Sequence, residues 1–179
     1  METGIRLVSL SQERTTCFKE EMQEAFENGF QGHIKEDGEN QWQVLPDGDF
    51  YQALRAEDAE AYEAVDADGQ RVSGAIIAID SAKRHGELAF LYVKVGVQGK
   101  GIGQAIWNNI EAMHPQVEVW ETCTPYFDRR NIHFYINCCG FHAIEFFNAH
   151  HRDPNMPEQF DLSDGLFVFE KQRNSSNRT

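Results

Sequence analysis

The glycine-rich turn Gln98-Gly99-Lys100-Gly101-Ile102-Gly103 carries the residues whose types and spacing point most directly to chemistry. It lies between a strand-like apolar run, residues 88–95, and a helix-like one, residues 105–113. Glycines let a ligand approach the backbone, and a helix that begins there directs unpaired N–H groups and its positive dipole end at one point. The turn therefore predicts a site for a phosphate or pyrophosphate group.

The spacing excludes two common phosphate-binding signatures. A P-loop needs Ser or Thr directly after its Lys, but Lys100 is followed by Gly101. A dinucleotide-binding fingerprint that starts at Gly101 would need a third glycine at Ile106. One that starts at Gly99 finds Gly103 a residue too early. The pattern that does fit is Gln/Arg-x-x-Gly-x-Gly/Ala directly after a strand.

With this pattern, over residues 91–103, the chain resembles the GNAT superfamily of acyl-CoA-dependent N-acetyltransferases. The resemblance implies acetyl-CoA as the acyl donor. It also implies that the strand before the turn splays from its neighbour and binds the acetyl and pantetheine groups through the backbone of Leu91, Val93 and Val95. The pyrophosphate is expected on the turn itself, at Gln98, Gly99, Lys100, Gly101, Ile102 and Gly103.

A second stretch, residues 131–141, resembles the family's helix that ends in Gly-Phe. In the family an Asn near its start binds the pantetheine, and a Tyr four residues before the Gly faces the sulfur. The resemblance assigns these roles to Asn131 and Tyr135, with Tyr135 as the general acid for the thiolate. Tyr135 lies five residues before Gly140, so either the helix holds an extra residue or Tyr135 faces elsewhere. Tyr126 is the alternative acid.

The resemblance also suggests a general base. Counted back from Gln98, Glu87 stands where the histone-acetyltransferase branch keeps its glutamate. A carboxylate there could accept the amine proton through water, and burial would raise its pKa toward neutrality. Glu121 and His133 are the alternatives, and purely structural roles for Glu87 and Tyr135 stay open.

We expect no metal site. The triplet 85–87, His-Gly-Glu, is similar to the His-x-Glu of zinc deaminases, but no Pro-Cys-x-x-Cys follows it. The cysteines, Cys17, Cys123, Cys138 and Cys139, show neither Cys-x-x-Cys spacing nor a disulfide framework. They are expected to be reduced thiols.

Hydrophobic periodicity predicts the elements that position these residues. Phe18, Met22, Phe26 and Phe30 form a core-facing stripe on a helix across residues 12–30. Apolar runs predict strands at residues 5–10, 61–65, 71–79, 87–95, 117–122, 143–147 and 166–170. Two polar connections, residues 31–49 and 148–165, are where contacts to the acceptor are expected.

A helix from Ile102, ended by Pro115, should connect two parallel strands. Asp128 is the expected N-cap of a later helix, and Gly140 its end. The fold class is therefore α/β (α+β): a mixed, mostly antiparallel sheet of six to seven strands, with one parallel strand-helix-strand unit and helices on both faces. The resemblance covers residues 5–171. We expect one domain, residues 1–171, and a polar tail, residues 172–179.

The composition indicates which classes of binding partner to expect. A formal net charge of −13 disfavours nucleic acid and favours a cationic substrate. No apolar run approaches the ~18 residues of a membrane span, and the N-terminus lacks a signal-peptide pattern, so we expect a cytoplasmic location and no membrane partner. A homodimer is compatible with the sequence.

Taken with the resemblance, these features predict an enzyme that transfers acetyl from acetyl-CoA to the primary amine of a small-molecule acceptor by direct attack. One alternative is a non-catalytic acyl-CoA-binding or sensor protein of the same fold. A second is an interaction protein that binds no CoA.

Overall fold

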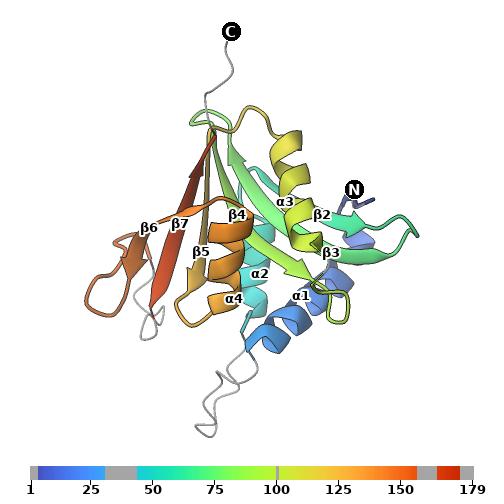
Figure 1. Cartoon of the computed structure of the whole chain (residues 1–179), viewed down its shortest axis with the longest axis horizontal. Coiled ribbons are helices and arrows are strands. Elements are labelled where there is room, and N and C mark those ends of the chain that lie inside the picture. Colours follow the sequence, from blue (N-terminus) through green and yellow to red (C-terminus); the bar gives the residue numbers. More distant parts are fainter. Residues whose placement is uncertain (1–3, 31–43, 100, 157–164, 174–179) are drawn as a thin grey trace, which may run out of the picture.

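The computed structural model describes residues 4–30, 44–99, 101–156 and 165–173. A seven-stranded sheet in the order β1-β2-β3-β4-β5-β7-β6 runs through this part of the chain (Figure 1). Its strands are β1 (Arg6–Ser9), β2 (Ala59–Val65), β3 (Arg71–Asp80), β4 (His85–Val93), β5 (Val119–Pro125), β6 (His142–Phe147) and β7 (Leu166–Gln172). Its helices are α1 (Thr15–Phe30), α2 (Asp47–Leu54), α3 (Ile102–Met113) and α4 (Arg129–His133), with a 3₁₀ turn at Gln12–Arg14 and a π-helical turn at Phe134–Cys138.

The sheet is mixed, as the sequence predicts. Strands β1 to β4 pair antiparallel in chain order, and β4 pairs parallel with β5 through the crossover helix α3. Strand β7 then inserts between β5 and β6 and pairs antiparallel with both. The last two strands in the sequence, β6 and β7, are thus antiparallel neighbours, and β6 rather than β7 lies at the edge of the sheet.

Helices cover both faces of the sheet. Figure 1 shows α3 and α4 in front of the sheet and α2 behind it. The core under α3 and α4 is built around Trp107, Trp120 and Phe141, and that under α1 and α2 around Phe18 and Phe50. All five side chains are almost fully buried, and full burial of a large apolar side chain contributes roughly 1.5–3 kcal/mol. The two cores fix the helices against opposite faces.

Strands β4 and β5 separate after three paired positions. Their pairing ends at Glu87↔Glu121, although β4 continues to Val93 and β5 to Pro125. Strand β4 also carries a bulge, because Leu88 and Phe90 face consecutive residues of β3 and leave Ala89 between them. The second half of β4 therefore has β3 on one side and no pairing with β5 on the other.

Strand β4 ends two residues earlier than the sequence predicted. The N–H of Val97 donates to the carbonyl of Lys94 at 3.2 Å, and Gly96 adopts φ of +91°. These two features make a turn of residues 94–97, so Val95 leaves the strand and is 39% exposed. None of the helices in the described ranges is long and apolar enough to cross a membrane.

Candidate active site

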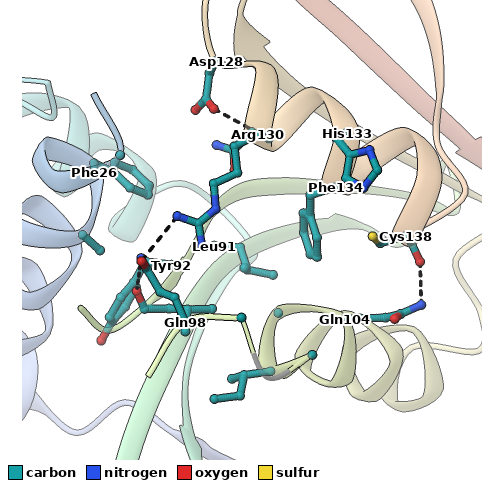
Figure 2. Close-up of a pocket in the computed structure, with 18 of the residues that line it drawn as sticks. Phe26, Leu91, Tyr92, Gln98, Gln104, Asp128, Arg130, His133, Phe134 and Cys138 are labelled. Carbon is teal, nitrogen blue, oxygen red and sulfur yellow. Dashed lines mark hydrogen bonds between the residues drawn. The ribbon is translucent and has the colours of Figure 1, made fainter. Parts of the chain in front are cut away.

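A cavity of about 360 Å³ lies beside the half of β4 that has no pairing with β5 (Figure 2). One wall is α1, and the opposite wall is α4 with its π-helical turn; the glycine-rich turn and the start of α3 complete the lining. Because α1 and α4 pack on opposite faces of the sheet, elements from both faces line the cavity, beside the end of β4 that does not pair with β5. A donor and an acceptor could therefore enter from different faces and meet.

The glycine-rich turn presents bare backbone to this cavity. Gly99 and Gly101 adopt φ of +85° and +70°, and a Cβ added at either would meet no atom within 4 Å. The backbone conformation, rather than crowding, thus favours glycine at both positions. Gly101 is the N-cap of α3, so the first free N–H groups of that helix begin at the cavity. Lys100 lies outside the described residues.

Gly103 has a different role from the other two glycines. A Cβ at this position would lie 3.1 Å from the ring of Phe134, so the missing side chain lets α3 come close to the π-helical turn that follows α4. The side-chain amide of Gln104 donates to the carbonyl of Cys138 at 2.7 Å and joins the same two elements. Gly103, Ile102 and Phe134 all line the cavity.

The backbone groups of Leu91 and Val93 on β4 have no hydrogen-bond partner on β3. The N–H of Lys94 donates to the carbonyl of Val72 on β3, which sets the phase of the antiparallel ladder. Since hydrogen-bonded positions alternate along such a pair, the backbone groups of Leu91 and Val93 point away from β3, toward the gap. Both residues line the cavity, whereas Val95, in the following turn, does not.

Arg130 is a cavity residue that the sequence did not single out. Its Nη1 donates to Oε1 of Gln98 at 3.3 Å, and Nε2 of Gln98 donates to the carbonyl of Val93 at 3.2 Å. Figure 2 shows Arg130 reaching from α4 to the turn through this contact. Among the described residues that line the cavity, Arg130 is the one permanently charged cation. Only the packing of α4 against the turn brings it there, so no sequence spacing could have revealed it.

Tyr135 is buried in the core and does not line the cavity. The N–H of Cys139 donates to the carbonyl of Phe134 at 3.0 Å, a π-type bond that accommodates the extra residue before Gly140. Tyr135 is 5% exposed, and the hydroxyl of the nearby Thr122 of β5 donates to the carbonyl of Leu88 at 2.9 Å. Burial raises the pKa of the Tyr135 phenol well above its usual range. Its role as the acid stays a prediction.

Glu87 and Glu121 are register partners at the last paired position of β4 and β5. They flank the point where the strands separate, although neither lines the cavity. Burial raises the pKa of Glu121 above its usual value; the nearby His85 opposes this shift, and the charge of Glu87 adds to it. His85 Nε2 lies 3.8 Å from Glu121 Oε2. The pair places two carboxylates beside the gap.

The start of α4 supplies further lining residues. Asp128 caps the helix as predicted, because its Oδ1 accepts from the N–H of Asn131 at 3.0 Å. Asn131 lines the cavity, and so does His133, whose Nδ1 lies 3.0 Å from Nδ2 of Asn137. Tyr126, the alternative acid, does not line it.

The end of α1 contributes an apolar wall. Phe26, Gly29 and Phe30 line the cavity, although the stripe that contains the two Phe residues predicted only core positions. The same periodicity that buries Phe18 and Met22 carries the stripe beyond the core to the cavity. No group of three His, Cys, Asp or Glu in the described part of the chain could hold a metal ion.

Comparison with known proteins agrees with this geometry. The family model described as Acetyltransferase (GNAT) family matches residues 18–141. A Bacillus subtilis (strain 168) protein named uncharacterized protein YrkN is 40% identical over 140 residues, which are 78% of this chain and 74% of that protein.

Solved structures share the fold at low sequence identity. The PaiA N-acetyltransferase of Thermoplasma acidophilum, in complex with coenzyme A, aligns with a TM-score of 0.66 at 18% identity and covers 94% of this chain and 99% of its own. The spermidine N-acetyltransferase of Vibrio cholerae, in complex with CoA and spermine, aligns with a TM-score of 0.66 at 12% identity, over 94% of this chain and 95% of its own. These likenesses concern the fold.

Proposed function

Because the chain belongs to the GNAT family of acetyltransferases, we propose that it transfers an acetyl group from acetyl-CoA to a primary amine by direct attack. The observation that carries the proposal is the cavity beside the unpaired end of β4, which is lined by elements from both faces of the sheet. Donor and acceptor can then be bound at the same time, and no acetylated protein is needed.

We assign the donor to the side of the cavity formed by α3 and α4. The pyrophosphate would accept hydrogen bonds from the N–H groups of the turn around Gly99, Gly101 and Gly103, aided by the dipole of α3. The pantetheine would bind the outward backbone groups of Leu91 and Val93 and the side chain of Asn131. The acetyl group would thus lie toward the point where the strands separate.

Arg130 is proposed as a further ligand of the pyrophosphate. Its guanidinium already contacts Gln98, the first residue of the turn, so a small movement would bring it to a phosphate held by the turn. Guanidinium groups bind phosphate through two parallel hydrogen bonds, which fixes orientation as well as charge. On binding, Gln98 would keep its bond to Val93 while Arg130 exchanges an amide oxygen for phosphate oxygens.

The proposed reaction needs a base and a proton source. The amine nitrogen attacks the thioester carbonyl carbon, the carbon–sulfur bond breaks, and the acetylated amine and the CoA thiol are released. Glu87 and Glu121 are proposed as the carboxylate pair that accepts the amine proton through water, and the raised pKa of Glu121 supports this role. Tyr135 is proposed as the acid, beside Thr122 at the same end of the gap.

One observation favours a second candidate function. Because Tyr135 is buried in the core and lies outside the cavity lining, the chain could bind acyl-CoA without transferring the acetyl group. Such a protein would be an acyl-CoA sensor of the same fold.

Two measurements on one preparation separate the candidates. Calorimetry measures CoA binding, and a thiol reagent measures CoA release from acetyl-CoA across a panel of primary amines. Amine-dependent thiol release supports acetyl transfer, and tight CoA binding without release for any amine supports the sensor. Absence of CoA binding by a folded protein would overturn both.

A further inference from the structure

We propose that the acceptor is a primary amine attached to an apolar body, of the arylalkylamine or alkylamine class, and that Gly29 provides the space for that body. The proposal rests on the proposed acetyl transfer and specifies its acceptor. It concerns the wall of the cavity that α1 forms, opposite the glycine-rich turn and α4 (Figure 2).

The α1 wall is apolar and its aromatic rings are held in place. Ala25, Phe26 and Phe30 line it, and Ala25 and Phe26 belong to the same core cluster as Tyr92 of β4. The ring of Phe30 lies 5.1 Å from that of Phe127, edge to face, and the ring of Phe26 lies 5.9 Å from that of Phe90. Rings fixed by other rings form a preorganised surface for an apolar group, which binds there because its surface leaves water.

Gly29 is the position where this wall is open. It lies within α1, its φ is not positive, and a Cβ at this position would meet no atom within 4 Å. Neither strain nor crowding therefore requires glycine, and glycine destabilises a helix relative to alanine. Gly29 is solvent-exposed and lines the cavity together with Phe26 and Phe30, so we infer that the space left by its missing side chain lies at the mouth of the cavity. A larger residue would fill that space.

The same wall is poorly suited to a second positive charge. Among the described residues that line the cavity, the one carboxylate is Asp128, on the α4 side, where it caps that helix. Glu21 of α1 is already bonded to the hydroxyl of Tyr92 at 2.9 Å and to Lys94 at 3.1 Å. Against the described residues of this wall, the second ammonium group of a polyamine would therefore lose its hydration beside Phe side chains, with none of those residues supplying a carboxylate.

A matched pair of acceptors tests the class. Hexylamine and 1,5-diaminopentane have the same length and differ in a terminal methyl or ammonium group. We expect kcat/KM for hexylamine to exceed that for 1,5-diaminopentane by at least about tenfold, and 2-phenylethylamine to be accepted as well. Calorimetry of both amines in the presence of CoA gives the preference independently of turnover.

Gly29→Leu tests the position. The added side chain should fill the space and lower kcat/KM for hexylamine by about tenfold or more, while the CoA-induced rise in melting temperature stays as in the wild type. Asn28→Leu is the matched control, because it adds the same side chain to the exposed neighbouring position, which does not line the cavity. This control should behave as the wild type.

The outcomes separate this inference from the proposed function. Equal or better use of 1,5-diaminopentane, or unchanged kinetics in Gly29→Leu, would overturn the acceptor class and leave acetyl transfer intact. Selective binding of hexylamine with no thiol release would support the apolar site and overturn the transfer. Absence of any amine binding would overturn the inference.

Discussion

Gly101 shows at the scale of one residue how the backbone and the ligand site depend on each other. Its φ of +70° begins α3 and leaves the following N–H groups free at the cavity. We expect Gly101→Asp to weaken CoA binding by at least about tenfold, because a carboxylate would lie beside the pyrophosphate. Gly101→Asn is the control, since Asn tolerates a positive φ and has nearly the same size without the charge. Calorimetry that gives equal affinities for both variants would remove the phosphate site from this turn.

The proposed contact of Arg130 with the pyrophosphate is tested by measuring the affinity of its variants for CoA. Arg130→Met should weaken CoA binding roughly tenfold to a hundredfold, as expected for the loss of a charge-assisted hydrogen bond of about 1.5–3 kcal/mol. The loss should be equal for CoA and 3′-dephospho-CoA, because the proposed contact is to the pyrophosphate next to Gln98. Arg130→Lys should recover part of the affinity. A loss confined to CoA would instead assign Arg130 to the 3′-phosphate.

The Glu87 and Glu121 pair predicts the pH dependence of the reaction. A carboxylate base works only when ionised, so kcat/KM should fall as the pH falls through the raised pKa of Glu121. Glu87→Gln removes a neighbouring negative charge and should lower the pKa of Glu121, which moves this limb of the profile to lower pH.

Glu121→Gln should remove the fall of kcat/KM at low pH and lower kcat roughly a hundredfold. Ionisation of the amine substrate also affects the pH profile, but its contribution is the same for all variants and cannot cause a difference between them. A profile that is identical in wild type, Glu87→Gln and Glu121→Gln would exclude both carboxylates as the base.

Local sequence signals predicted part of the candidate site. The glycine-rich turn is recognisable because its spacing along the chain creates the geometry, and Asn131 was predicted from the resemblance of residues 131–141 to the family's helix; both line the cavity. Arg130 and Gly29 carry no such signal, because their place in the cavity depends on how α4 and α1 pack against the sheet.

The π-helical turn after α4 matters at the scale of elements. It accommodates the extra residue before Gly140 and sends the ring of Tyr135 into the core, next to Thr122. Tyr135→Phe keeps the ring and removes the hydroxyl. If Tyr135 is the acid, kcat should fall at least about tenfold with nearly unchanged CoA affinity. A lower melting temperature with wild-type kcat would show that the hydroxyl only stabilises the core.

Element order was predictable because it rests on local patterns. The periodicity of residues 102–113 and of the apolar runs on either side implied a parallel crossover, and β4, α3 and β5 form one. The position of β7 between β5 and β6 was not predictable, because strand pairing over a long connection leaves no local signal. The early end of β4 at Val93 depends on Gly96, whose positive φ starts the turn.

At the scale of the whole molecule, the gap between β4 and β5 connects the two faces of the sheet. Each face has its own helices and its own core, so the gap can stay open without loss of either core. The proposed donor side is lined by the glycine-rich backbone and by polar side chains of α4, Arg130 among them, and the proposed acceptor side by the aromatic rings of α1. This division is the physical basis on which we propose direct transfer between two molecules bound at once.

Initial rates measured while both acetyl-CoA and hexylamine are varied test this claim most directly. Simultaneous binding predicts double-reciprocal lines that intersect, and the intact mass of the protein should not change when acetyl-CoA is added alone. Parallel lines, together with an acetylated protein that forms without amine, would contradict direct attack through the gap between β4 and β5.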